Sequence, residues 1–219
     1  MAERTSPTEK TRRRYNRLAP FFDLMETPME WLRFGDWRAR LRDKIAGPRA
    51  LEVGVGTGKN MPYYPPGVEI AAIDLSPSML AKARKRADAL NIDVSLLEMD
   101  VQNLECPDNI FDTVFATFVF CSVPDPVQGL KELRRVVKPD GRLLLLEHMR
   151  PGNRILAAGF DAFNPLVSRM MGANINRRTV ENIRNAGWVV DVEEHLSADI
   201  VRWIEASPKK SVTREGYAP

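Results

Sequence analysis

Three glycines at alternate positions, Gly54, Gly56 and Gly58, end an apolar segment of the chain. Because glycine has no Cβ, a ligand can approach the backbone of such a turn closely, beside the N-terminus of a following helix. The turn is not a P-loop, because Asn60 rather than Ser or Thr follows Lys59. Its G-x-G-x-G spacing also differs from the G-x-G-x-x-G of dinucleotide-binding proteins. Alone, the pattern is weak, since a tight turn without a ligand uses glycine too.

Two acidic residues, Asp74 and Asp100, end the next two apolar segments. Asp74 comes 20 residues after Gly54, a position from which a carboxylate accepts hydrogen bonds from both ribose hydroxyls of a nucleotide. A carboxylate at Asp100 can accept a bond from an exocyclic adenine amine. Each acid alone is more typical of a cap or a turn. Together, at the carboxyl ends of consecutive strands, they predict a nucleoside site at the switch point of an α/β sheet.

Apolar segments alternate with helical ones from Arg49 onward. They are rich in Val, Leu, Ile and Phe with little alternation, as in strands buried on both faces of a parallel sheet. We therefore predict an α/β fold, with a doubly wound, mostly parallel seven-stranded sheet and one antiparallel strand at its end. The predicted strands are 50–55, 68–75, 93–101, 111–120, 141–149, 188–195 and 200–207, and the predicted helices between them are 78–90, 124–137, 153–171 and 177–186.

Helical pieces over residues 11–45, broken near Pro20 and Pro28, form an N-terminal cap. In the sheet region, Ser76-Pro77 predicts a helix start, with a hydroxyl N-cap and proline at the first helical position. The apolar face of that helix is predicted to consist of Met79, Leu80, Ala83, Ala87 and Leu90.

The net charge of +3 over 219 residues conceals an asymmetry. Residues 1–49 hold 12 Lys and Arg against 7 Asp and Glu, which leaves 20 against 22 for residues 50–219. A basic N-terminal region favours an anionic partner, either nucleic acid or a membrane surface, unless it is simply a solvated helix face. The chain has no apolar run of membrane-spanning length, no secretory signal and only two cysteines, so we expect a reduced, cytoplasmic protein.

Five blocks of sequence carry a resemblance to a known family. LEVGVGTGKN, AAIDLSPSML, EMDVQNL, FDTVFATFVFCSVPD and LRRVVKPDGRLLLLEH, in this order, resemble the class I S-adenosylmethionine-dependent methyltransferases. Within that class the chain is most similar to the quinone C-methyltransferases and the bacterial phosphatidylethanolamine N-methyltransferases. The segment YNRLAPFFDLM (15–25) resembles the opening segment of that group. The resemblance divides the chain into a basic, amphipathic cap (1–48), an S-adenosylmethionine-binding domain (49–210) and a tail (211–219).

The resemblance implies the contacts of the cofactor, S-adenosylmethionine. The glycine turn passes the methionine moiety, Thr117 lies beneath the sulfonium, and Tyr15 closes over the methionine end. Asp74 holds the ribose and Asp100 the adenine. The full set of implied cofactor residues is Tyr15, Glu52, Gly54, Gly56, Gly58, Asp74, Leu75, Met79, Asp100, Val101 and Thr117.

The methyl acceptor is less clear, because methyl transfer from a sulfonium needs mainly alignment and desolvation. No metal is expected, since two His and two Cys are widely scattered. Tyr15 and His148 are the candidates to take a proton from the acceptor, although His148 is equally well a structural residue. The apolar segment 150–178 offers Arg154, Asn174 and Arg177 for binding a substrate phosphate, or is a core-packing helix with solvated arginines.

Basic residues mixed with large aromatic ones over residues 10–42 favour contact with an anionic membrane surface, or a lid that packs on the sheet. The first hypothesis is therefore N-methylation of phosphatidylethanolamine by an enzyme peripheral on the inner face of the membrane. The alternatives are C-methylation of a polyprenyl benzoquinone or naphthoquinone, and methylation of a small soluble amine or thiol. A nucleic-acid-binding module is disfavoured, because no recognition motif accompanies the charge.

Overall fold

The computed structural model describes residues 5–29, 35–170, 174, 176–197 and 200–208. Residues 30–34 of the predicted cap and the predicted tail 211–219 lie outside the described residues.

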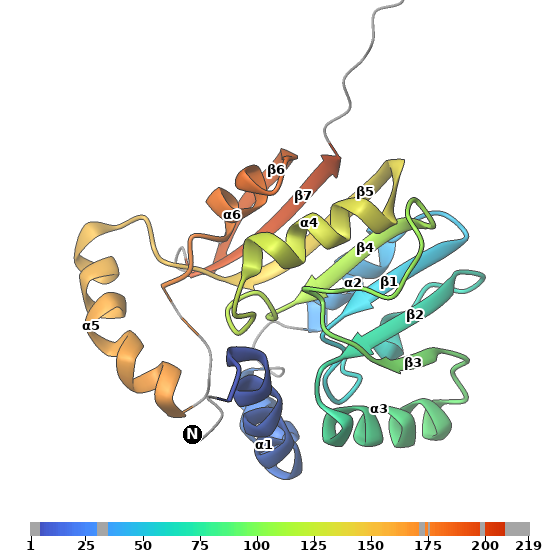
Figure 1. Ribbon diagram of the computed structural model, residues 1–219, viewed down its shortest axis with the longest axis horizontal. Coiled ribbons are helices and arrows are strands. Elements are labelled where there is room, and N and C mark those ends of the chain that lie inside the picture. The colour runs from blue at the N-terminus through green and yellow to red at the C-terminus, as the bar shows by residue number, and fades with distance from the viewer. Residues whose placement is uncertain (1–4, 30–34, 171–173, 175, 198–199, 209–219) are drawn as a thin grey trace, which may run out of the picture.

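The sheet has seven strands in the order β3-β2-β1-β4-β5-β7-β6 (Figure 1). Strands β1 to β5 pair in parallel, whereas β7 runs antiparallel to both β5 and β6. The prediction of a mostly parallel sheet with one antiparallel strand is thereby confirmed. The strands are β1 (Arg49–Val53), β2 (Glu69–Asp74), β3 (Ser95–Glu98), β4 (Phe111–Thr117), β5 (Val137–His148), β6 (Trp188–Ser197) and β7 (Val201–Pro208).

Three predicted strands differ from the structure by three residues or more at one end. The predicted strand 93–101 is shortened to β3, the predicted strand 111–120 ends at Thr117, and the predicted strand 141–149 begins earlier, because β5 starts at Val137. The second difference has a local cause, because Phe118 has a φ of +59°, a left-handed conformation that turns the chain out of the sheet.

Helices cover both faces of the sheet, as a doubly wound fold requires. The helices of the described structure are α1 (Pro7–Met29), α2 (Gly35–Lys44), the short 3₁₀ helix η2 (Met61–Tyr63), α3 (Pro77–Leu90), α4 (Pro126–Val136), α5 (Arg154–Met170) and α6 (Thr179–Asn185). The largest part of the core lies between the sheet and α4 with α6, where Leu130 and Ile183 pack with Val114 and Leu143.

The opposite face of the sheet is covered by α2 and α3. Leu41 of α2 packs with Phe115 and Leu144, and Leu80 of α3 packs in a cluster with Ala72. Ser76 caps α3 as predicted, since its Oγ accepts a bond from the N–H of Met79 at 3.2 Å. The other four residues of the predicted apolar face of α3 are buried, but Leu90 is 43% exposed, because the helix ends there in the left-handed Asn91.

The predicted break near Pro20 is wrong, because α1 continues through it. An internal proline costs a helix about 3 kcal/mol, so α1 needs support from the rest of the protein. That support lies on both sides of Pro20. Asn16 Oδ1 accepts a bond from Ser76 Oγ at 2.6 Å, and Asp23 Oδ1 accepts one from Thr57 Oγ1 at 2.7 Å. None of the described helices is long and apolar enough to cross a bilayer.

Candidate active site

The glycine turn after β1 leaves no room for a side chain at Gly54. Gly54 and Gly56 have φ values of +65° and +55°, the left-handed region that favours glycine. A Cβ on Gly54 would lie 2.5 Å from Cγ2 of Val119. The N–H of Gly56 donates to Asp74 Oδ2 at 2.9 Å, so the turn and the end of β2 form one unit at the carboxyl edge of the sheet.

Asp74 has its carboxylate fixed by backbone donors on both oxygens. In addition to the bond from Gly56, Oδ1 accepts a bond from the N–H of Ser76 at 2.8 Å. Burial raises the pKa of Asp74 to about 6, although these N–H donors act in the opposite direction. A carboxylate oxygen accepts more than one hydrogen bond. Asp74 can therefore still accept hydrogen bonds from the two hydroxyls of a diol in the cavity that it lines.

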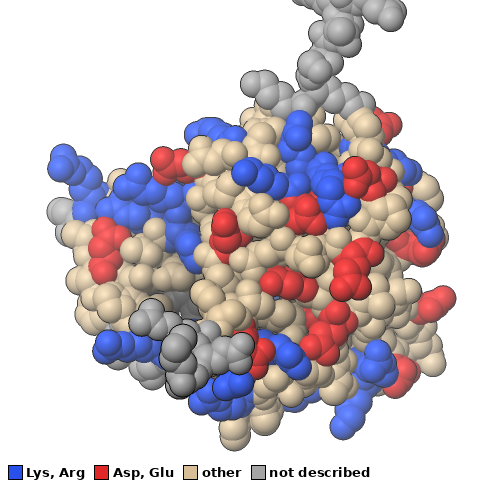
Figure 2. All heavy atoms as spheres, viewed as in Figure 1, with Lys and Arg blue, Asp and Glu red and all other residues tan. Residues whose placement is uncertain are grey.

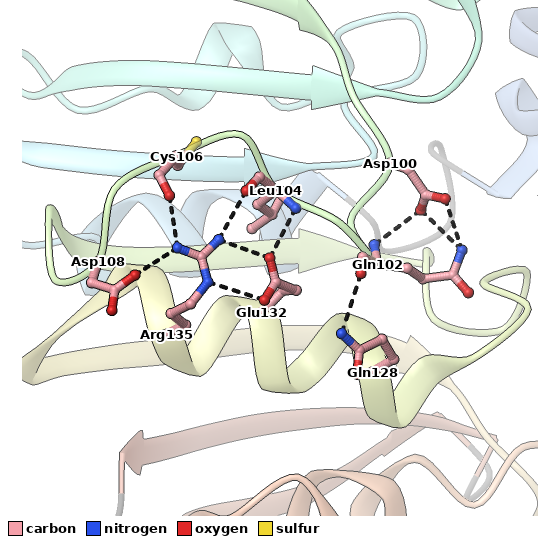
Figure 3. A network of polar contacts seen from close by, with 8 residues as sticks. All are labelled: Asp100, Gln102, Leu104, Cys106, Asp108, Gln128, Glu132 and Arg135. Atoms are coloured by element: carbon pink, nitrogen blue, oxygen red, sulfur yellow. Dashed lines mark hydrogen bonds and ion pairs between the residues drawn. The ribbon is translucent and has the colours of Figure 1, made fainter.

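Asp100 follows β3 and is held by Gln102 (Figure 3). The side-chain amide of Gln102 donates to both carboxylate oxygens at 2.9 and 3.0 Å, and its main-chain N–H donates to Oδ1 at 2.9 Å. Thr8 of α1 adds a bond from its hydroxyl to Oδ2 at 3.2 Å. The carboxylate is therefore oriented both by its own loop and by the helix that covers it.

Arg135 of α4 fastens the loop that follows Asp100 (Figure 3). Its guanidinium donates to the main-chain oxygens of Leu104 at 2.8 Å and Cys106 at 2.7 Å. It also pairs with Asp108 and with Glu132, each at 2.7 Å. One half-buried guanidinium thus ties this loop to a helix of the core.

A cavity at the carboxyl edge of the sheet brings together most of the predicted cofactor residues. They come from α1, from the ends of β1, β2 and β4, from α3 and from the loop after β3. The predicted residues that line it are Tyr15, Gly54, Gly56, Asp74, Leu75, Met79, Asp100, Val101 and Thr117.

Glu52 and Gly58 do not line this cavity. Glu52 is buried behind it, where its carboxylate accepts bonds from Asn60 Nδ2 at 2.7 Å and from the hydroxyl of Tyr64, and burial raises its pKa. Gly58 faces Met61, whose Sδ would lie 2.7 Å from an added Cβ. Both residues therefore shape the turn from behind.

Sequence reasoning missed a buried cation in the cavity. Arg38 of α2 is 3% exposed, and its Nη1 donates to Asn60 Oδ1 and, at 3.3 Å, to the hydroxyl of Thr117. All three residues line the cavity. A signal was present, because Arg38 stands three and seven residues before Leu41 and Ile45, on the buried stripe of the helix.

The aromatic residues at the opening were also missed. Phe22 and Phe118 line the cavity, and the ring of Phe22 lies 6.4 Å from that of Tyr15. His148 lies behind Phe118, with the two rings stacked at a centroid distance of 4.4 Å. Burial lowers the pKa of His148 to about 4, so it is neutral at physiological pH.

Glu147, next to His148, holds the loop that follows β4. Its Oε1 accepts bonds from the N–H groups of Val119 and Phe120, both at 2.9 Å, while its Oε2 is buried without a hydrogen-bond partner among the described residues. Burial raises the pKa of Glu147 to about 7. The carboxyl group therefore shapes the loop that contacts Gly54, and no feature of the sequence indicated this.

The three predicted substrate-binding residues do not line the cavity. Arg177 is half-buried and donates from Nη2 to the carbonyl of Val123 at 2.8 Å, and Asn174 bonds to the carbonyl of Cys121 through its N–H at 2.8 Å. Arg154 is exposed at the first residue of α5. Arg177 and Asn174 thus hold the back of the loop that lines the cavity, and a role of the three in binding substrate stays a prediction.

Known proteins agree with this arrangement. A family of sequences described as "Methyltransferase domain" matches residues 51–145. A ubiquinone/menaquinone biosynthesis C-methyltransferase of Ectopseudomonas mendocina is 31% identical over 194 residues, which cover 80% of this chain and 75% of that protein. The chain belongs to the class I S-adenosylmethionine-dependent methyltransferases.

Two further proteins, one similar to this chain in sequence and one in fold, have different acceptors in their names. A phosphatidylethanolamine N-methyltransferase of Cereibacter sphaeroides is 39% identical over 114 residues, or 51% of this chain, and the match spans little more than half of that protein (56%). The fold is that of geranyl diphosphate C-methyltransferase from Streptomyces coelicolor, solved with S-adenosyl-L-homocysteine, with a TM-score of 0.68, 14% identity and coverage of 81% and 80% of the two chains.

The methyl donor of this family is S-adenosylmethionine, and the cavity fits it. The glycine turn, where a Cβ on Gly54 would collide with Val119, gives the close backbone approach that a nucleoside needs. The carboxylates of Asp74 and Asp100 lie in the cavity as acceptors for ribose and adenine donors. Arg38 supplies a buried cation for the carboxylate of the cofactor's methionine moiety. No group of three or more His, Cys, Asp or Glu in the described part of the chain is placed to hold a metal ion.

Proposed function

We propose that this chain transfers the methyl group of S-adenosylmethionine to a lipid-like acceptor at an anionic membrane surface, with phosphatidylethanolamine as the leading acceptor. One observation carries the proposal. The helix that covers the cofactor cavity, α1, has an outer face that is basic in its first half and apolar in its second.

The two faces of α1 have different partners. Tyr15 and Phe22 face inward and line the cavity. The outward residues are spaced three or four apart, as on one helix face, and all are exposed: Lys10, Arg13, Arg17, Phe21 and Leu24. Phe21 is 63% and Leu24 75% exposed, far more than a residue of a packed lid needs. Such a face inserts its apolar part at the bilayer boundary, and each basic residue near an anionic surface adds about 1 kcal/mol.

A second helix, α5, also carries exposed apolar residues. On α5, Leu156 is 47% and Phe163 65% exposed, seven residues apart and thus on one face. The helix projects from the sheet in Figure 1, and Figure 2 shows a hollow beside it with Lys and Arg gathered at its rim. A lipid headgroup entering between the two helices would leave its acyl chains in the bilayer.

Inside the cavity, the residues are assigned to the cofactor from one end to the other. The glycine turn and Arg38 hold the methionine moiety, and Thr117 lies beneath the sulfonium. Asp74 and Leu75 hold the ribose. Met79, Asp100 and Val101 enclose the adenine, and Tyr15 closes over the methionine end from α1.

The reaction needs a lone pair on the acceptor. S-adenosylmethionine supplies a methyl group already activated by its sulfonium. The acceptor ammonium first loses a proton to solvent. The lone pair of the resulting amine then forms a bond to the methyl carbon, while the carbon–sulfur bond breaks and the thioether sulfur keeps the pair of electrons of that bond. The cavity walls exclude water and fix the line of attack.

Tyr15 is the better candidate for the residue that contacts the acceptor. Its side chain lines the cavity, whereas His148 lies behind Phe118 and has a pKa of about 4. A base with so low a pKa does not readily take a proton from an ammonium group. We assign His148 to the support of the Phe118 ring.

The runner-up is C-methylation of a polyprenyl quinone precursor, and a specific observation favours it. The wall beyond Thr117 is largely apolar, with Phe118, Val119 and Val123 in the lining. Such a slot accepts a flat ring without an ammonium group.

Methyl transfer to vesicles tests the proposal. Phe21→Ser with Leu24→Ser should slow methylation of phosphatidylethanolamine in anionic vesicles severalfold, because the helix loses its insertion face. The binding of S-adenosylhomocysteine should be unchanged. The matched control is Leu90→Ser, an exposed leucine at the end of α3. An unchanged rate in the double variant, or an equal loss in the control, contradicts the membrane part of the proposal.

A further inference from the structure

Three cations from the body of the protein converge on one carboxylate of α1. Asp23 Oδ1 lies 3.4 Å from Arg86 Nη2 and 3.6 Å from Lys59 Nζ, and Asp23 Oδ2 lies 3.8 Å from Lys82 Nζ. The same Oδ1 accepts the 2.7 Å bond from the hydroxyl of Thr57. Burial acts to raise the pKa of Asp23, but the hydrogen bond from Thr57 and the three cations together lower it.

The charges in this cluster do not balance. Lys59 follows the glycine turn, and Lys82 and Arg86 stand one turn apart on α3. Within the described residues, Asp23 is the only carboxylate in ion-pair distance of any of the three. One negative charge thus faces three positive ones, each of them only partly exposed, with side-chain exposures of 18% to 32%. Partly buried positive charges so close together favour the binding of a further anion, or of an anion more highly charged than the Asp23 carboxylate.

We infer that Lys59, Lys82, Arg86 and the Thr57 hydroxyl form a binding site for a phosphate group, which Asp23 occupies while α1 covers the cavity. A guanidinium, two ammonium groups and a hydroxyl are the donors that phosphate oxygens accept from. A phosphodiester presents more acceptor oxygens than a carboxylate and so satisfies more of these donors at once.

The location of this site connects it to the reaction. Thr57 and Lys59 also line the cofactor cavity, so a phosphate held here lies at its edge. Phe21 and Leu24, the exposed residues of α1, flank Asp23 in the sequence. Insertion of these residues into a bilayer would draw Asp23 away from the cluster and leave the cations to a lipid phosphate. This lipid part of the inference rests on the proposed function, whereas the phosphate site itself does not.

Asp23→Asn tests the site, because it removes the competing charge with little change in size. We expect this variant to bind inorganic phosphate and glycerophosphoethanolamine roughly tenfold more tightly than the wild type in titration calorimetry. Adding Lys82→Gln and Arg86→Gln should abolish the gain. The matched control adds Arg84→Gln and Lys85→Gln instead, two exposed basic residues of the same helix, and should retain it. Retention of the S-adenosylhomocysteine-induced rise in Tm shows that each variant is folded.

Vesicles distinguish the source of the phosphate. Binding to phosphatidylglycerol vesicles over phosphatidylcholine vesicles should weaken severalfold in Lys82→Gln/Arg86→Gln and not in Arg84→Gln/Lys85→Gln. A response to soluble phosphate without this difference on vesicles overturns the lipid source. Equal phosphate binding by wild type and Asp23→Asn, or equal loss in the two pairs of glutamine variants, overturns the site. None of these measurements requires methyl transfer, so a failure of the proposed acceptor is seen separately.

Discussion

The hydroxyl of Thr8 donates a 3.2 Å hydrogen bond to the carboxylate of Asp100, so the first turns of α1 meet the loop after β3 directly over the cavity. The side-chain amide of Gln102 bonds both to that hydroxyl, at 3.1 Å, and to the carboxylate. Helix α1, the loop after β3 and Asp100, the proposed adenine contact, are therefore one connected unit.

Replacing Gln102 should weaken cofactor binding without unfolding the protein. Methionine is similar in length to glutamine, but in Gln102→Met the carboxylate of Asp100 loses the side-chain amide that bonds to both of its oxygens. We expect S-adenosylhomocysteine to bind about threefold to tenfold more weakly. Calorimetry measures this. The control is Gln128→Met, whose amide bonds to a main-chain oxygen of the same network (Figure 3). Equal affinities of the two variants would speak against an orienting role for Gln102.

Arg38 should recognise the amino-acid end of the cofactor. In Arg38→Met the buried charge is lost, and we expect S-adenosylhomocysteine to bind about tenfold more weakly or worse, since hydrogen bonds to charged groups are worth about 1.5–3 kcal/mol. Methylthioadenosine, which lacks the carboxylate, is the matched ligand, and its affinity should change much less. Equal losses for both ligands would mean that Arg38 supports the fold of the cavity rather than the carboxylate.

Cofactor affinity should fall in mild acid because of Asp74. Its pKa of about 6 means that the carboxylate is ionised above that pH and protonated below it. The ionised form is the one that accepts both ribose hydroxyls. The affinity for S-adenosylhomocysteine should therefore be highest above about pH 7 and should decrease as the pH falls through 6. Asp74→Asn should bind weakly at every pH, and a pH dependence that survives in this variant assigns the titration to another group.

Glu147 should make the protein less stable as the pH rises. Its pKa is raised from 4.5 to about 7, so the native state binds a proton that the unfolded state has released between these values. The stabilisation is complete below about pH 4.5 and is lost as the pH rises through 7, by about 3 kcal/mol. Urea unfolding at pH 5 and pH 8 measures this loss. Glu147→Gln should reduce the difference between the two pH values by that amount, and an unchanged difference would rule out Glu147 as its source.

The strands and the glycine turn could be predicted because their signals are local. A buried parallel strand is a run of Val, Leu, Ile and Phe, and Gly54, Asp74 and Asp100 mark where such runs end at one edge. Residues whose environment is made by distant parts of the chain could not be predicted in the same way. The spacing of Arg38 with Leu41 indicates a buried position, but its contact with Thr117 at 3.3 Å joins residues 79 apart in the chain and depends on the fold.

The continuity of α1 and the position of Arg177 also depend on contacts between distant parts of the chain. A proline predicts a break from local geometry, and contacts such as that of Asn16 with Ser76 support a helix that continues through Pro20. Arg177 was expected to bind a phosphate, yet its guanidinium donates to the carbonyl of Val123, a partner 54 residues away in the chain.

The central claim is that the acceptor is the amine of phosphatidylethanolamine. Its most direct test offers the protein both acceptors at once, in vesicles of phosphatidylethanolamine, phosphatidylglycerol and demethylmenaquinone, with S-adenosylmethionine carrying a deuterated methyl group. Mass spectrometry of the extracted lipids then locates the label. We predict labelled mono-, di- or trimethylated phosphatidylethanolamine, absent with Asp74→Ala. Label in the quinone alone would contradict the claim and promote C-methylation, and label in neither lipid would exclude both.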